Sequence, residues 1–102
     1  MGTPYVSART GDFSATLYDT WGQGIGNYPH TAGDVVNIGT TPNDAHVVTY
    51  DISSAIELGN ITIGAASGSG NSILKVSRVM TTLLALGNTN LTVNATGELD
   101  FG

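Results

Sequence analysis

Short apolar runs separated by turn-forming residues dominate the chain from residue 34 onward. The runs occupy residues 35–38, 47–50, 61–63, 91–93 and 99–101. In the last three, one polar residue stands between two apolar residues, so the apolar side chains share one face of an extended backbone. Each run is too short for a helix and lies next to Gly, Asn or other turn residues, which predicts β-strands joined by turns.

An internal repeat indicates how these strands are arranged. Residues 53–60 align with residues 81–88 at an offset of 28, and both segments end in Leu-Gly-Asn. After two inserted residues, the run at 61–63 corresponds to the run at 91–93. Self-similarity at such a period is typical of stacked architectures, in which each repeat buries its apolar face against its neighbours. We therefore expect an all-β fold, a short parallel β-solenoid (β-helix), with an antiparallel β-sandwich as the alternative.

Two segments also carry helix signals. Residues 53–59 and 77–87 each combine a polar start with a Gly stop, so single helical turns remain an alternative there. The first third differs from the rest, because it is rich in Gly, Thr and Tyr and contains Gly22, Gly24 and Gly26 in one loop. We expect residues 1–33 to form an N-terminal arm and cap and residues 34–102 to form the solenoid coils, within one structural domain.

Composition and charge narrow the classes of partner. The 102 residues include 3 basic and 8 acidic side chains, a net charge of −5 at pH 7, which disfavours nucleic acid and anionic membrane surfaces. No apolar run approaches the roughly 20 residues of a membrane-spanning helix. Because the chain has no cysteine, disulfides and thiolate metal sites are excluded. The first residues lack the pattern of a secretory signal peptide, so we expect either that the protein is not exported by that route or that a leader has been removed from this sequence.

Few residues suggest catalysis or metal binding. His46 with Asp44 and Asp51 is the best candidate for a divalent ion, but a solvent-exposed loop histidine is the favoured interpretation. Ser14, Asp34 and His30 would supply the residue types of a nucleophilic triad, yet no Gly-x-Ser-x-Gly elbow surrounds the serine. We expect no catalytic residue, no cofactor and no metal site.

Other motifs are better explained by structure. Asp34 and Asp51 have the residue type of the paired carboxylates that hydrolyse glycosides, but Asp34 is expected to cap the turn that enters the strand at 35–38. The glycine loop at 22–26 lacks the Lys-Ser/Thr ending of a phosphate loop. The segment 64–71, with its Gly, Ser and Ala residues, is interpreted as a flexible loop at which the chain changes direction. Asparagines in the N-glycosylation pattern at 60, 90 and 94 are read as turn residues.

Aromatic residues gather in the first third of the chain. Tyr5, Tyr18, Trp21 and Tyr28 are candidates for contact with a partner protein or a glycan, since their rings can stack on sugars. The alternative, which we favour, is a hydrophobic lid over the end of the coil, together with Phe13.

The order of several short motifs resembles the opening of β-helix surface proteins of bacteria and phages. The motifs are Gly-Asp-Phe-Ser at 11–14, Trp-Gly at 21–22, the segment 29–38, Leu-Gly-Asn-Ile-Thr-Ile-Gly at 58–64, and the segment 91–102. The resemblance implies the start of a right-handed parallel β-helix in which Phe13 and Trp21 cover the open end of the coil. The chain departs from the family's tight glycine run, because Gln23 and Ile25 interrupt the glycines.

These observations favour a structural role. We expect a phage virion component, such as a tail-fibre, spike or head-surface (decoration) protein, that mediates assembly or attachment on the virion surface. Its partners would be other virion proteins or copies of itself, in a homo-oligomer such as a trimer, and a cell-surface glycan. The alternative is the non-catalytic N-terminal segment of a secreted bacterial adhesin or carbohydrate-active β-helix protein, located outside the cell. A stand-alone enzyme ranks third.

Overall fold

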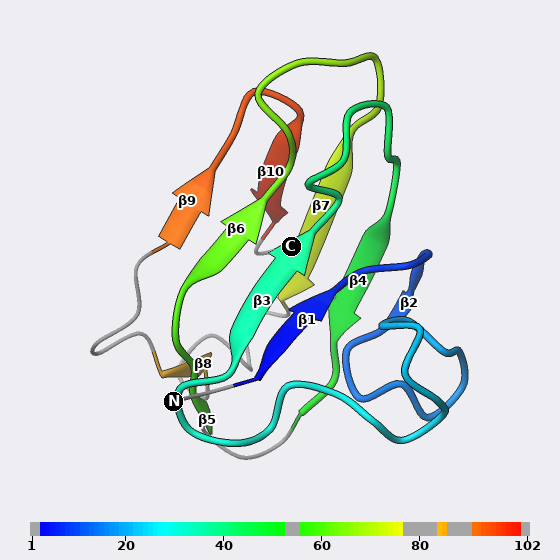
Figure 1. Ribbon diagram of the computed structural model, residues 1–102, viewed down its shortest axis with the longest axis vertical. Helices are drawn as coiled ribbons and strands as arrows, with labels where there is room; N and C mark the ends of the chain where they lie inside the picture. The colour runs from blue at the N-terminus through cyan, green and yellow to red at the C-terminus, as the bar shows by residue number, and fades with distance from the viewer. Residues whose placement is uncertain (1–2, 53–55, 77–83, 86–90, 101–102) are drawn as a thin grey trace.

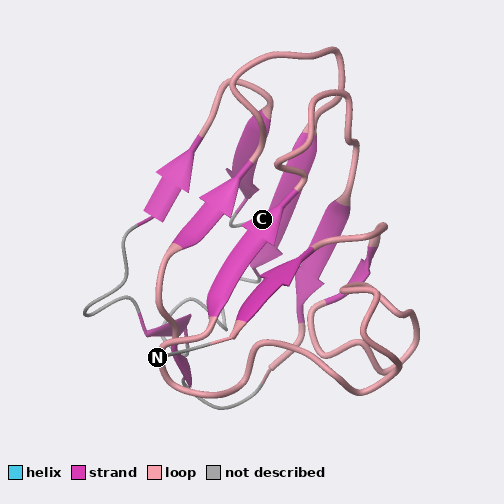
Figure 2. Ribbon diagram, viewed as in Figure 1, coloured by secondary structure: helices cyan, strands magenta, loops and turns pink. Residues whose placement is uncertain are grey.

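The computed structural model describes residues 3–52, 56–76, 84–85 and 91–100. All regular secondary structure in these ranges is β-strand (Figure 2). The strands are short, and they are β1 (Pro4–Val6), β2 (Gly11–Asp12), β3 (Val35–Ile38), β4 (Val47–Tyr50), β5 (Ile56–Glu57), β6 (Ile61–Ile63), β7 (Ser72–Val76), β8 (Leu84–Ala85), β9 (Leu91–Val93) and β10 (Gly97–Asp100). The expected all-β class is confirmed. In the described ranges no helix is long and apolar enough to span a membrane.

The strands form two four-stranded sheets that face each other. One has the order β1-β3-β6-β9 and the other the order β2-β4-β7-β10, while β5 and β8 form a third, two-stranded sheet (Figure 1). The chain alternates between the two larger sheets, so each passage through both adds one strand to each. Between the described strands every pairing is parallel, and the antiparallel pairing of the alternative fold is not found among them.

The strand register confirms the internal repeat. Ile56 pairs with Leu84, which is the offset of 28 seen in the sequence. Ile61 pairs with Leu91, an offset lengthened by the two inserted residues. Equivalent residues of successive repeats are therefore neighbours across a parallel ladder. This arrangement stacks side chains of the same kind into columns.

The core lies between the two larger sheets and follows the alternation of the strands. Val36 and Ile38 of β3 are fully buried, as are Ile61 and Ile63 of β6. The facing sheet contributes Val48, Tyr50, Leu74 and Val76. Each buried aliphatic side chain of this size contributes about 1.5–3 kcal/mol relative to full exposure. Burial of these columns is the main force that holds the two sheets together.

Hydroxyl groups satisfy the backbone where the chain turns from one sheet to the other. The Ser7 Oγ accepts a hydrogen bond from the Gly39 N–H at 2.8 Å. The Ser72 Oγ accepts one from the His46 N–H at 3.0 Å, and the Thr96 Oγ1 accepts one from the Ala65 N–H at 2.7 Å. All three hydroxyl residues are buried. Without these bonds, backbone donors at the corners would lie buried and unpaired.

The observed boundaries differ from those expected at the start of the chain. Strand β1 pairs with β3 and β2 pairs with β4, so residues 4–12 belong to the stacked sheets and the irregular arm is confined to residues 13–34. Of the segments with helix signals, residues 56–57 and 84–85 are strands, whereas residues 53–55, 77–83 and 86–87 lie outside the described residues. Phe101, the end of the last expected strand, also lies outside them.

Candidate functional site

An aromatic lid closes the end of the molecule at β1 and β2. The arm of residues 13–34 loops over this end, opposite β9 and β10 (Figure 1). Phe13 and Trp21 are buried, and their rings meet edge to face with centroids 5.5 Å apart. The Trp21 Nε1–H donates a hydrogen bond to the Phe13 carbonyl at 2.9 Å. The lid therefore covers the first pair of strands with apolar rings whose polar atom is satisfied.

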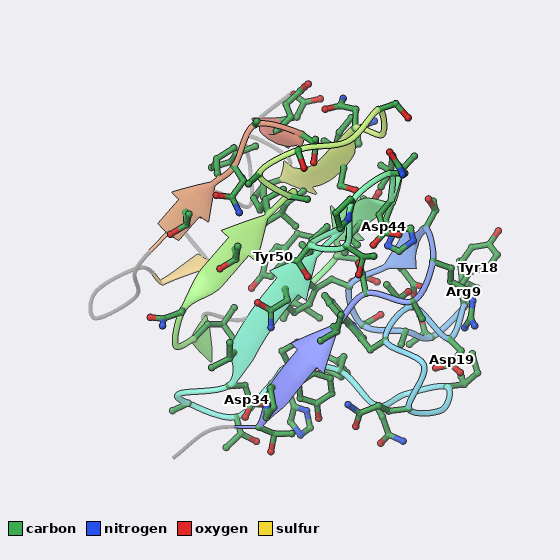
Figure 3. The ribbon with its side chains drawn as sticks, turned by 45° about the horizontal axis from the view of Figure 1, so that its top comes forward. Arg9, Tyr18, Asp19, Asp34, Asp44 and Tyr50 are labelled. Carbon is green, nitrogen blue, oxygen red and sulfur yellow. The ribbon has the colours of Figure 1, made fainter. Side chains whose placement is uncertain are left out.

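The four aromatic candidates for partner contact occupy different environments. Tyr5 is buried against Trp21 of the lid, with ring centroids 6.2 Å apart, and Trp21 is itself buried. Tyr28 is half-buried and packs against Phe13, at a centroid distance of 6.3 Å. Tyr18 is 57% exposed and its ring projects outward (Figure 3). Of the four, Tyr18 is thus the residue whose ring is open to a ligand.

Asp12 fixes the loop that carries Tyr18. Its carboxylate accepts hydrogen bonds from the Thr16 hydroxyl at 2.7 Å, from the Thr16 N–H at 2.9 Å, and from the N–H groups of Leu17 and Tyr18 at 3.2 Å. Burial alone would raise the pKa of Asp12, but the bonds from Thr16 and Leu17 outweigh it and lower the pKa from 3.8 to about 2. The loop is therefore held by an ionised carboxylate.

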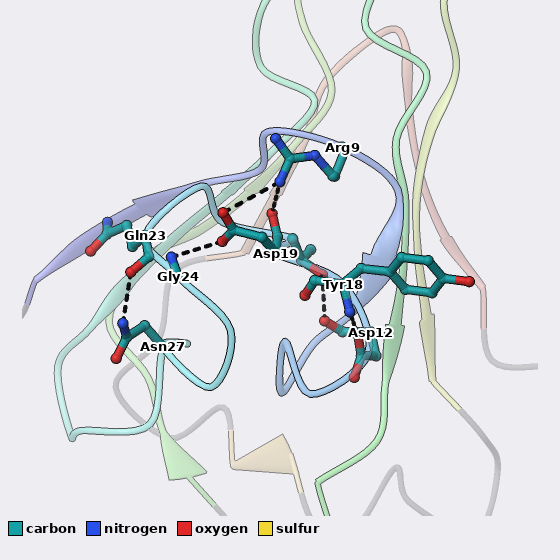
Figure 4. A network of polar contacts seen from close by, with 8 residues as sticks. Arg9, Asp12, Tyr18, Asp19, Gln23, Gly24 and Asn27 are labelled. Carbon is teal, nitrogen blue, oxygen red and sulfur yellow. Dashed lines mark hydrogen bonds and ion pairs between the residues drawn. The ribbon is translucent and has the colours of Figure 1, made fainter.

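A second set of contacts holds the neighbouring part of the arm. Arg9 donates to the Asp19 carbonyl and forms an ion pair with the Asp19 carboxylate at 3.5 Å, and that carboxylate also accepts a hydrogen bond from the Gly24 N–H at 2.9 Å (Figure 4). Three large side chains of the arm of residues 13–34 remain exposed, those of Leu17, Tyr18 and Ile25. They are presented on loops whose backbones are fixed.

The residues of the hypothetical triad do not assemble. The Ser14 hydroxyl donates to Asp51 at 2.6 Å and lies 3.2 Å from Asp12. Asp34 accepts from the backbone N–H groups of Thr3, His30 and Thr31, as expected for a turn cap. Asp34 and Asp51 share none of these partners, so the described contacts give no support to a pair of cooperating carboxylates.

A contact that the sequence did not suggest joins Ser7 and His46, with Asp44 close to the other side of the imidazole ring. The Ser7 Oγ lies 2.7 Å from His46 Nδ1, and His46 Nε2 lies 4.0 Å from the Asp44 Oδ1. The 4.0 Å separation is too long for a hydrogen bond, and Ser7 is one of the buried hydroxyls that satisfy the corners. No sequence motif marks this pair, because the two residues are 39 positions apart and meet through the strand register.

His46 is also not the solvent-exposed histidine that was expected. Its side chain is mostly covered and bonded to Ser7, while Asp51 is engaged with Ser14. Within the described ranges, no group of three or more His, Cys, Asp or Glu side chains is arranged to hold a metal ion. The structure thus brings together His46 and Asp44 of the candidate metal set, but not Asp51 with them.

The end opposite the lid is open. Leu91 and Val93 continue the columns of Ile61 and Ile63, but they are 38% and 45% exposed. Strands β9 and β10 each have one neighbour in their sheets (Figure 1). Leu99 is half-buried against the core, and Glu98 is exposed beside it. This end, defined by Leu91, Val93, Glu98 and Leu99, is called the open edge below.

Comparison with known proteins adds no relative to this description. No protein-family profile, no curated protein and no solved structure matches the chain.

Proposed function

We propose that the chain is a structural module that begins a parallel β-solenoid and joins a larger assembly through its open edge. The observation that carries the proposal is the difference between the two ends. At the lid, Phe13 and Trp21 are buried, whereas Leu91 and Val93 at the other end lie in line with the core and remain half in water. An edge strand with exposed apolar side chains is a ready template for another strand.

Within this class, we propose a component of a virion surface, such as a tail fibre, spike or head-surface protein. Support comes from the resemblance of the motifs at 11–38 and 58–64 to β-helix surface proteins, and from stacked parallel strands with buried apolar columns. Such columns give a stiff stack that resists unfolding, which suits a particle exposed to shear and proteases. The charge of −5 also favours solubility at high local density.

The second candidate is a segment of an adhesin or carbohydrate-active protein that contacts glycans. It is favoured by one observation, the exposed ring of Tyr18 beside Arg9 and Asp19 on a fixed loop (Figure 4). Aromatic rings flanked by charged side chains are suited to stacking on sugars while bonding their hydroxyls.

Two measurements separate the candidates. Immunogold labelling of purified virus particles with an antibody against the chain should decorate the particle surface, and labelling of a cell envelope or secreted fraction instead would contradict the virion assignment. A glycan array with the wild-type chain and Tyr18→Ala should show no binding that depends on Tyr18. Specific binding lost in the variant would favour the second candidate.

The assembly itself is tested by sedimentation velocity over a wide range of protein concentration, with the other components of the particle added in turn. We expect larger species whose formation is reduced by Leu91→Asp. The matched control is Leu17→Asp, which makes the same change on the exposed surface of the lid. Equal effects of the two substitutions would mean that the open edge is not the assembly surface.

A further inference from the structure

We propose that the outward face of the sheet β1-β3-β6-β9 pairs with the same face of a second copy of this chain. The inference goes beyond the proposed function, because the open edge extends the stack along its axis, whereas this face joins two stacks side by side. It rests on how charged side chains are divided between the two larger sheets.

The strand register identifies the outward side chains of this sheet. Tyr5, Val36 and Ile61 form one buried column, so the residues next to them in each strand point away from the core. The outward positions are occupied by uncharged residues that are half-buried or exposed, namely Pro4, Val6, Val35, Asn37, Thr62 and Thr92. We call these residues the neutral face. In Figure 1 the sheet lies toward the viewer, in front of the facing sheet.

The facing sheet carries charged residues at its outward positions. One outward column runs through Asp12, Thr49, Lys75 and Asp100. The exposed Glu98 belongs to the next outward column. Because each chain has a net charge of −5, two copies repel each other, and the repulsion is smallest when each presents a surface without charged side chains. The neutral face is such a surface, whereas the outward face of the facing sheet is not.

The side chains of the neutral face are able to pair with their own kind. In a dimer with a two-fold axis, the same residues lie on both sides of the interface, so each group must suit a copy of itself. Hydroxyls and carboxamides meet this condition because they both donate and accept hydrogen bonds, whereas an ionised carboxylate only accepts and an ammonium group only donates. Val6 is 49% exposed and adds apolar area that pairing would remove from water.

The size of the neutral face sets the strength of the contact. Four strands of three or four residues, spaced about 4.8 Å apart, present a flat area of roughly 200–250 Å². A stable dimer buries about 800 Å² on each partner, so two single modules pair weakly and reversibly. A stack of parallel layers grows along its axis, so further layers would lengthen this face without covering it.

The absence of cysteine allows such a weak contact to be trapped, since one introduced cysteine supplies the only thiol. Thr62→Cys places it on the neutral face. Thr49→Cys is the matched control, because Thr49 occupies an outward position of a central strand in the facing sheet. A bismaleimide crosslinker joins two thiols without the strict geometry of a disulfide.

Thr62→Cys should form crosslinked dimers about tenfold or more faster than Thr49→Cys, after correction for the reaction of each thiol with a monofunctional maleimide. Added salt should increase the yield for Thr62→Cys, since it screens the repulsion between two acidic copies. Equal rates for the two cysteine variants, or a yield that falls with salt, would overturn the inference.

Substitution by aspartate separates the neutral face from a general effect of charge. In sedimentation equilibrium at high protein concentration, Thr62→Asp should lower the average mass towards that of the monomer. Thr49→Asp makes the same change of charge on the facing sheet and should leave the mass close to that of the wild type. Equal masses for the two aspartate variants would contradict the lateral contact.

The lateral contact and the open edge can fail separately. Leu91→Asp should leave the crosslinking of Thr62→Cys unchanged. If the two cysteine variants crosslink equally while assembly still depends on Leu91, the lateral contact is wrong and the proposed function stands. If Thr62→Cys crosslinks selectively while assembly does not depend on Leu91, the lateral contact stands and the proposed function falls.

Discussion

Replacing one valine in the core and one at the open edge with alanine measures directly whether the last layer is covered. Val36 of β3 is 0% exposed and Val93 of β9 is 45% exposed, and each loses the same two methyl groups in the substitution. At about 0.8 kcal/mol per buried carbon, Val36→Ala loses about 1.6 kcal/mol of transfer free energy. The cavity left between β1 and β6 brings the loss of unfolding free energy to roughly 2–3 kcal/mol.

At Val93 the same change costs less, because the side chain is already half in water. The buried 55% of the transfer term amounts to about 0.9 kcal/mol, since the exposure is 45%, and water fills the space without a cavity. For a domain of this size, each kcal/mol lowers the melting temperature by about 4–8 °C, so we expect losses of about 8–24 °C for Val36→Ala and about 4–7 °C for Val93→Ala.

Differential scanning calorimetry of both variants and the wild type at low protein concentration provides the measurement. Equal losses of melting temperature for the two variants in dilute solution would refute the reasoning, because Val93 would then be as buried as Val36. A loss for Val93→Ala that grows with added partner would instead mark the burial of this residue on assembly.

Three further outcomes follow from individual contacts. Gly26→Ala should lower the unfolding free energy by about 1 kcal/mol, because the backbone φ of Gly26 is 86°. Gly39→Ala, at a φ of 59°, should lower it by about 3 kcal/mol or more, because a Cβ at Gly39 would also overlap Ser72. Chemical denaturation compares the two variants. Asp12→Asn should be less stable than the wild type above about pH 4, and the difference in unfolding free energy should narrow as the pH falls towards 2, because the pKa of Asp12 in the folded protein is lowered to about 2. Urea titrations of both proteins at each pH measure this difference, and a difference that does not change with pH would contradict the prediction. Tyr50→Phe should raise the unfolding free energy by about 1 kcal/mol, because among the described side chains the buried Tyr50 hydroxyl has no hydrogen-bond partner. The same burial raises the pKa of Tyr50. A variant less stable than the wild type would indicate that the hydroxyl is hydrogen-bonded in solution.

The strands that sequence reasoning found are the short apolar, β-prone runs bounded by turn-forming residues. Residues 35–38, 47–50, 61–63 and 91–93 are strands β3, β4, β6 and β9 with the expected bounds. Strand β7 was missed because a polar residue, Ser72, occupies an inward position in it. That residue is buried because its hydroxyl accepts the His46 N–H, a role that depends on a backbone group 26 residues away. The pattern of apolar and polar residues around Ser72 therefore cannot reveal that its hydroxyl bonds the His46 N–H.

The aromatic candidates show the same limit. Tyr5, Tyr18, Trp21 and Tyr28 are equivalent as sequence, since each is an aromatic ring in the Gly-rich first third of the chain. The fold of the arm buries Tyr5 and Trp21 against the first strands and leaves Tyr18 outside. Which ring faces water depends on how Asp12 and Asp19 hold the loops, and these bonds form only once the arm is closed.

By itself, the sequence determined that residues 35–38, 47–50, 61–63 and 91–93 are extended, which of their side chains share a face, and which repeats correspond. These properties depend on neighbours a few residues apart and on self-similarity along the chain. The tertiary structure alone decided that the pairing is parallel, that Ser7 meets His46, and that one end is covered while Leu91 and Val93 are not. The parallel pairing and the Ser7–His46 contact depend on residues 25 or more positions apart, and their free energy appears only when the layers are stacked.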